Sequence, residues 1–163
     1  MPDRDYGIET LCLHAGQIPD PVTGARAVPI HQTTSFVFDS AEHAASLFNL
    51  QTFGNVYSRL SNPTVAVLEE RIAAIEGGRA SLATASGMAA EMTAMLTLLE
   101  AGDHFVAAST LYGGTWSQFA VTFKRMGISC TFVEPDEPAN FRAALQPNSK
   151  AIFVESLANP RLN

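Results

Sequence analysis

The chain has 163 residues, of which 47% are hydrophobic and 16% charged, and its formal net charge at pH 7 is −6. This length suits one domain with a sizeable core. The acidic balance and the lack of a Lys/Arg cluster argue against nucleic acid or an anionic membrane as a partner, and no apolar run is long enough to cross a bilayer. Charged residues make up about a quarter of a typical domain. Their lower share here indicates that another subunit, or further polypeptide, covers part of the surface.

Cysteine usage points to a reducing environment. Cys12 and Cys130 are too few for a disulfide framework and lack the spacing of metal ligands. The first residues do not show the basic and then apolar pattern of a signal peptide. We therefore expect a cytoplasmic protein without a metal site.

Residues 1–60 are expected to form an N-terminal arm, a short helix and a loop. Prolines and glycines interrupt every candidate element before residue 38. Asp39 and Glu42 then have the spacing of a capping box, which predicts a short helix through Leu47 or Phe48. The remainder, residues 61–163, is expected to form an α/β domain.

Tyr57 and Arg59 lie in the loop before the next predicted helix. Residues two apart in an extended segment point the same way, so the phenol and the guanidinium would converge on one target. Arginine suits a phosphate because its planar fork makes paired, charge-assisted hydrogen bonds. A surface arginine beside a packed tyrosine is the alternative interpretation.

A long helix is predicted from Pro63 to the residue before Gly77, since Asn62 is a good N-cap and Pro63 a good first helical residue. After it, short apolar runs alternate with helical patterns, which predicts repeated βαβ units. We expect an α/β fold with a mostly parallel sheet and helices on both faces, a three-layer αβα arrangement. The predicted strands are Ala80–Thr84, His104–Ala108, Ile128–Val133 and Lys150–Val154.

Ser86 and Gly87 join the first predicted strand to a helix. A helix start presents unpaired backbone N–H groups and the positive end of the helix dipole, which together favour an anion. The serine adds a hydroxyl donor, so this junction could hold a phosphate. A helix cap with nothing bound is the alternative.

Other unusual residues also follow predicted strands, where ligands gather in parallel sheets. Tyr112 follows the second strand of the series, and Glu155 and Asn159 follow the fourth. An aromatic ring beside a phosphate site suggests a ligand that carries a flat ring as well. The sequence lacks both the Gly-x-Gly-x-x-Gly and the P-loop patterns, which argues against dinucleotides and P-loop nucleotides.

Several segments, in chain order, resemble the motifs of the Cys/Met-metabolism family of pyridoxal-phosphate enzymes. They are Tyr57-Ser58-Arg59, Asn62-Pro63-Thr64, Ala85-Ser86-Gly87-Met88, Leu111-Tyr112-Gly113-Gly114-Thr115, and Val154-Glu155-Ser156 with Asn159-Pro160. The resemblance covers essentially the whole chain. It implies the large domain of the fold-type I pyridoxal-phosphate transferases, present only in its N-terminal portion.

The same resemblance implies pyridoxal 5'-phosphate (PLP) as the cofactor. Ser86, Gly87 and Met88 resemble the residues that hold its phosphate, the last two through their backbone N–H groups. Tyr112 resembles the aromatic residue that stacks on the pyridine ring.

Four further roles follow from the resemblance. Asn159 would hydrogen-bond the phenolic oxygen of the ring, with Glu155 supporting it. Tyr57 and Arg59 would reach the phosphate in a neighbouring subunit, which places the active site at a dimer interface. Tyr57 and Tyr112 would also take part in catalysis.

The start of the chain narrows the expected activity. Four segments most resemble the O-acetylhomoserine sulfhydrylase branch of the family: Glu9–Leu11, His14–Gln17, Thr23–Arg26 and Phe53–Asn55. This branch implies synthesis of homocysteine from O-acetylhomoserine and sulfide, for methionine or cysteine biosynthesis, by a homotetramer. The alternatives are cystathionine γ-synthase, a cystathionine lyase, methionine γ-lyase, or a non-catalytic αβ chain that binds a ligand or partner.

The lysines depart from the family pattern. PLP chemistry needs a lysine that forms a Schiff base, yet Lys124 and Lys150 both lie outside the family's Ser-x-x-Lys setting. We therefore expect the 163-residue chain alone to be inactive.

Overall fold

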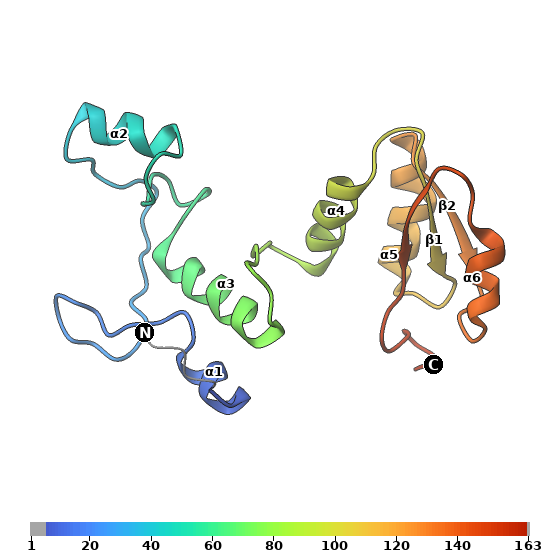
Figure 1. The fold of residues 1–163 in the computed structure, drawn as a ribbon, viewed down its shortest axis with the longest axis horizontal. Coiled ribbons are helices and arrows are strands. Elements are labelled where there is room, and N and C mark those ends of the chain that lie inside the picture. The colour runs from blue at the N-terminus through green and yellow to red at the C-terminus, as the bar shows by residue number, and fades with distance from the viewer. Residues whose placement is uncertain (1–5, 163) are drawn as a thin grey trace. The chain divides into compact units, whose positions relative to one another are not determined.

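The computed structural model describes residues 6–162 and divides into two compact units, with the boundary between Ala83 and Thr84. The first unit contains three helices, α1 (Ile8–His14), α2 (Ala41–Phe48) and α3 (Pro63–Glu76) (Figure 1). The helix predicted from Pro63 is confirmed at both ends. Asn62 caps it by accepting a hydrogen bond from Thr64 N at 2.9 Å, and Gly77 ends it with a φ of 65°.

Helix α2 is capped one residue later than the sequence predicts. Its N-cap is Ser40, whose hydroxyl accepts from His43 N at 3.0 Å. Asp39 lies outside the helix, and its carboxylate is 3.2 Å from His43 Nδ1. The predicted capping box of Asp39 with Glu42 is therefore wrong, because the neighbouring serine satisfies the first turn.

The strand predicted at Ala80–Thr84 is also wrong, since this segment has no regular secondary structure. Its polar groups bond instead to α3: Ser81 Oγ donates to Glu69 O, and Ala83 N donates to Glu69 Oε1 at 2.8 Å. A run of small apolar residues forms a strand only if it pairs with another strand. This segment bonds to Glu69 of α3 instead.

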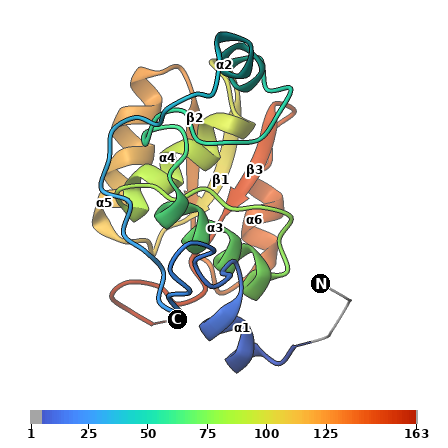
Figure 2. The ribbon, with the colours of Figure 1, turned by 90° about the vertical axis from the view of Figure 1, so that its left-hand side faces the viewer.

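The second unit is a three-layer α/β structure. Its parallel sheet has the order β2-β1-β3, and Figures 1 and 2 show α5 on one face and α6 on the other. This arrangement confirms the predicted fold class. The elements are α4 (Gly87–Leu98), β1 (His104–Ala108), α5 (Gly113–Ser117), a π-helix continuing from α5 (Gln118–Phe123), β2 (Ser129–Val133), α6 (Pro138–Ala144) and β3 (Ser149–Phe153).

The core of the second unit forms around β1, every residue of which is buried. The Phe105 ring packs edge-on against Phe119 and Phe123, with centroids 4.9 and 5.9 Å away. Met95 of α4 and Leu99, the C-cap residue of that helix, join the same cluster. The sheet is therefore anchored to the helices that precede and follow β1, which fixes the loops at its carboxyl edge.

Both cysteines are free. Burial raises the pKa of the Cys130 thiol to about 12, so this side chain stays protonated and unreactive at neutral pH. Among residues 6–162 no helix has the length and apolar content to cross a membrane. The described residues also hold no group of three or more His, Cys, Asp or Glu side chains that could bind a metal ion.

His104 is the first residue of β1, the central strand, and is completely buried. Its Nδ1 lies 2.7 Å from Ser149 Oγ on β3, and its Nε2 lies 2.9 Å from Thr131 Oγ1 on β2. The imidazole thus joins all three strands. Burial lowers the pKa of His104 because the charged ring is poorly solvated there.

We expect acid to destabilise the second unit through His104. The unfolded chain takes up a proton near pH 6.5, at about the ordinary pKa of histidine, whereas the folded chain does not. The free energy of unfolding should therefore be constant above that pH and fall as the pH decreases below it. Denaturant titrations followed by the fluorescence of Trp116, the only tryptophan, measure this directly.

His104→Gln removes the titrating group and should flatten the dependence, whereas His31→Gln, at an exposed position, should preserve it. If the free energy of unfolding of the His104→Gln variant falls equally steeply with decreasing pH, other groups cause the effect.

Candidate functional site

The start of α4 leaves several hydrogen-bond donors available. Ser86 is the N-cap, and its hydroxyl accepts a hydrogen bond from Ala89 N at 3.2 Å. Within the described chain, the N–H groups of Gly87 and Met88 have no hydrogen-bond acceptor. An added Cβ at Gly87 would meet no atom within 4 Å, so the approach to these N–H groups is open. Two backbone donors, the Ser86 hydroxyl and the helix dipole are thus available at one point.

The ring of Tyr112 lies close to this helix start. A Cβ built on Gly114 would be 2.5 Å from Tyr112 Cε1 and 3.2 Å from Met88 Sδ. Only a glycine therefore lets the Tyr112 ring fold back over its own turn, beside Met88. The Tyr112 side chain remains 53% exposed, so it is open to contact with a ligand.

The loop after β3 is tied to the same place. Glu155 Oε1 accepts a hydrogen bond from Tyr112 N at 3.0 Å, joining the loops that follow two neighbouring strands. Asn159 lines a cavity of about 240 Å³ with Ser109, Thr110 and other residues. The hydroxyl of Thr110 is buried and has no hydrogen-bond partner within the described chain.

Tyr57 and Arg59 lie together in the first unit. The Arg59 guanidinium carbon is 5.3 Å from the centre of the Tyr57 ring, a cation–π distance. Tyr57 pairs with Ser35 in an isolated antiparallel bridge, and Ser58 N donates to Thr34 O at 2.8 Å. The loop is thus fixed by the preceding arm, and the two side chains that the sequence singled out are adjacent.

The residues of the second unit fit a ligand that has a phosphate and a flat ring. The unpaired N–H groups at the start of α4 match the phosphate, and the exposed face of Tyr112 matches the ring. Met88 lies between the two features, because it supplies one of the N–H groups and its Sδ is 3.2 Å from the position of a Gly114 Cβ, which Tyr112 Cε1 also approaches. The structure brings Met88 near Tyr112, and Tyr112 to Glu155, whereas it records no contact between Asn159 and these side chains.

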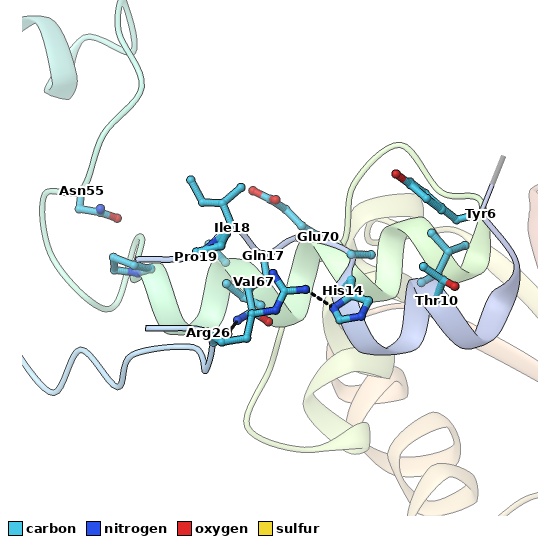
Figure 3. Close-up of a pocket in the computed structure, with 15 residues that line it drawn as sticks. Tyr6, Thr10, His14, Gln17, Ile18, Pro19, Arg26, Asn55, Val67 and Glu70 are labelled. Carbon is cyan, nitrogen blue, oxygen red and sulfur yellow. Dashed lines mark hydrogen bonds between the residues drawn. The ribbon is translucent and has the colours of Figure 1, made fainter. Parts of the chain in front are cut away.

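A larger cavity, of about 810 Å³, lies in the first unit between α1, the arm that follows it and α3 (Figure 3). Arg26 Nη2 lies 3.0 Å from His14 Nδ1 on its wall. Since arginine only donates, His14 Nδ1 is the acceptor in this pair. None of the side chains predicted for the site lines this cavity.

Sequence reasoning missed the polar contacts beneath Tyr112. Thr115 Oγ1 donates to Glu91 Oε1 at 3.0 Å, and Gln118 Nε2 donates to Met88 O at 3.3 Å. The one signal was Glu91 itself, the only charged residue of α4.

Comparisons with known proteins identify the family of the chain. A family model described as Cys/Met metabolism PLP-dependent enzyme matches residues 9–163. O-acetyl-L-homoserine sulfhydrylase of Leptospira meyeri is 54% identical over 160 residues, which are 98% of this chain and 36% of that protein. O-acetyl-L-homoserine sulfhydrylase 1 of Thermus thermophilus is 56% identical over 156 residues, which are 95% of this chain and 37% of that protein.

Solved structures give the same result. A Campylobacter jejuni protein assigned as O-acetylhomoserine (thiol)-lyase, which carries N'-pyridoxyl-lysine-5'-monophosphate, matches with a TM-score of 0.92 at 40% identity, over 98% of this chain and 39% of that chain. Cystathionine gamma-lyase of Lactobacillus plantarum matches with a TM-score of 0.85 at 35% identity, over 97% of this chain and 39% of that chain. The chain thus spans somewhat more than a third of the length of these relatives. It belongs to the Cys/Met metabolism family of PLP-dependent enzymes.

Proposed function

We propose that the whole protein uses PLP to make homocysteine from O-acetylhomoserine and sulfide. Its relatives at 54% and 56% identity are O-acetylhomoserine sulfhydrylases. The observation that carries the proposal is the junction of the α4 start with Tyr112, which presents phosphate donors and an aromatic face together.

In this proposal Ser86, Gly87 and Met88 hold the phosphate, and Tyr112 holds the ring. When bound, PLP supplies an electron sink that stabilises negative charge on substrate carbons. Tyr112 positions the ring through its flat face, and Glu155 fixes the backbone of Tyr112.

We further propose that Asn159 hydrogen-bonds the phenolic oxygen of the cofactor. The phenol groups of Tyr57 and Tyr112 are the proposed acid–base groups, because a phenol can donate or accept a proton.

The Schiff-base lysine is proposed to come from outside this chain, which alone would be inactive. Lys150 is the second residue of β3, and Lys124 lies at the end of the helical segment that precedes β2. Both therefore lie near the amino ends of strands, whereas Tyr112 and Glu155 follow the carboxyl ends. In a parallel sheet the amino ends and the carboxyl ends of the strands lie on opposite sides, so neither lysine is on the side of Tyr112 and Glu155.

Tyr57 and Arg59 are proposed to reach the phosphate of a neighbouring subunit, in a cytoplasmic homotetramer with its active sites at dimer interfaces. The exposure of large apolar side chains in the first unit supports burial against another surface; they include Ile30, Val37, Leu50 and Phe53. Residues 1–60 would be the interface arm, and residues 61–163 the first part of the PLP-binding domain.

The test of the activity is an assay of the PLP-loaded, full-length protein with competing substrates. We expect homocysteine from O-acetylhomoserine and sulfide at a rate far above any cleavage of cystathionine. Faster cleavage of cystathionine would favour the second candidate, a cystathionine lyase, which the Lactobacillus plantarum structure represents.

Arg59→Ala in the full-length protein should weaken PLP binding. The lost hydrogen bond to a charged group is worth about 1.5–3 kcal/mol, or roughly ten- to a hundredfold in Kd. The measurement is an absorbance titration with PLP, with Arg59→Lys as the variant that keeps the charge.

Mixed oligomers test whether this contact crosses the subunit boundary. Combining the Arg59→Ala subunit with one that lacks the Schiff-base lysine should restore some active sites. No recovery in a verified hybrid would show that Arg59 acts within its own subunit or away from the phosphate.

A further inference from the structure

A buried polar contact joins α4 to α5 directly beneath the candidate site. Thr115 has no exposed surface, and its Oγ1 donates to Glu91 Oε1 at 3.0 Å. The same hydroxyl lies 3.9 Å from Met88 Sδ. A second bond, from Gln118 Nε2 to Met88 O at 3.3 Å, ties the two segments again. Thr115 of α5 and Gln118 of the π-helix that continues it therefore hold the first turns of α4.

The contact is costly for the fold. Glu91 Oε2 and Gln118 Oε1 are both buried, and neither has a hydrogen-bond partner within the described chain. A buried polar atom without a partner destabilises a protein, whereas apolar side chains of the same shape would pack here without that cost. Stability of the helix pair alone does not account for a glutamate at this position.

The spacing shows what the contact joins. Glu91 lies three residues after Met88, one helical turn from the N–H groups at the start of α4. Thr115 lies three residues after Tyr112, at the base of the turn that carries its ring. The bond therefore links the element that presents phosphate donors to the element that presents the aromatic face.

We propose that Thr115 and Glu91 are positioning residues, which set the distance and tilt between the Tyr112 ring and the start of α4. This inference rests on the proposed function, because that distance must match the spacing of ring and phosphate in PLP. Neither side chain touches the cofactor in this proposal, so their effect on it passes through Met88 and Tyr112.

The test uses the full-length protein and two readouts besides activity, the Kd for PLP and the visible circular dichroism of bound PLP. Thr115→Val keeps the shape and removes the donor, and it should raise the Kd about tenfold and change the dichroism signal. Thr115→Ser keeps the hydroxyl and should resemble the wild type. Thr93→Val is the matched control, since Thr93 is exposed on α4 and donates to Ala89 O; it should change neither readout.

Glu91 provides an independent pair of variants if Thr115→Val fails to fold. Glu91→Gln keeps an oxygen that can accept from Thr115, so its Kd for PLP and its dichroism signal should equal those of the wild type. Glu91→Leu removes the acceptor, so it should raise the Kd and change the dichroism signal.

The possible results separate this inference from the proposed function. A Thr115→Val or Glu91→Leu protein that unfolds at lower denaturant concentration, but binds PLP with unchanged Kd and dichroism, would overturn the positioning role and leave the proposed function intact. Failure of the wild-type protein to bind PLP would overturn both.

Discussion

Gly114→Ala should weaken PLP binding about tenfold or more while leaving the fold of the second unit intact. The added Cβ would lie 2.5 Å from Tyr112 Cε1, so the ring has to swing away from its place beside Met88. The cofactor would lose a stacking contact worth about 0.5–1.5 kcal/mol beyond the area that it buries. The cofactor would also lose the apolar area that the Tyr112 ring buries. Together the two losses should raise the Kd for PLP by a factor on the order of ten.

Gly113→Ala is the matched control, because a Cβ there would meet no atom within 4 Å. It should bind PLP as the wild type does. The measurement is an absorbance titration of the two full-length variants, with Tyr112→Phe and Tyr112→Ala beside them. Tyr112→Phe should keep most of the affinity and Tyr112→Ala should lose it. Equal affinity of the Gly114→Ala and Gly113→Ala proteins would remove the Tyr112 ring from the site.

The second large effect is expected at Gly16, where the N-terminal arm crosses α3. Gly16 has a φ of 69°, and an added Cβ would lie 2.8 Å from both Val67 O and Glu70 Cβ. Alanine there would be strained by about 1–2 kcal/mol and would also push the arm off the helix. The Arg71 side chain would then lose its bonds to Ala15 O and Gln17 Oε1. The free energy that holds the arm against α3 should therefore fall by an amount on the order of 3 kcal/mol.

Hydrogen exchange of the amides in α1 and the following loop measures how firmly the arm is held against α3. In the Gly16→Ala protein these amides should exchange about a hundredfold faster, as the lost free energy implies. Gly24→Ala provides the comparison, because Gly24 has a similar φ of 70° and no atom within 4 Å of an added Cβ. It should show the backbone strain alone. The same exchange rates in both variants would mean that the close approach of Gly16 to α3 does not hold the arm.

The parts of the fold that could be predicted from the sequence are those with local signals. Asn62-Pro63 and Gly77 mark both ends of α3, and His104–Ala108 is a buried strand read correctly from an apolar run. The segment at Ala80–Thr84 carries a similar apolar signal, but Glu69 of α3 takes up its polar groups. Strand formation depends on a partner, which the local sequence does not specify.

The candidate site divides in the same way. Ser86 and Gly87 could be predicted as the cap and the first residue of a helix because the two adjoin in sequence. The contact between Glu91 and Thr115 spans 24 residues, so no local pattern indicates it. The need for glycine at position 114 is also invisible in sequence, because it arises from where the Tyr112 ring folds. The roles of all the predicted site residues toward the cofactor stay predictions; they are Tyr57, Arg59, Ser86, Gly87, Met88, Tyr112, Glu155 and Asn159.

A crystal structure of the full-length protein with PLP is the most direct measurement of whether this chain forms the phosphate and ring sites. We expect the phosphate within hydrogen-bond distance of Gly87 N, Met88 N and Ser86 Oγ, with the pyridine ring against the face of Tyr112. A phosphate held by other residues, with the start of α4 facing only solvent, would contradict the proposed site.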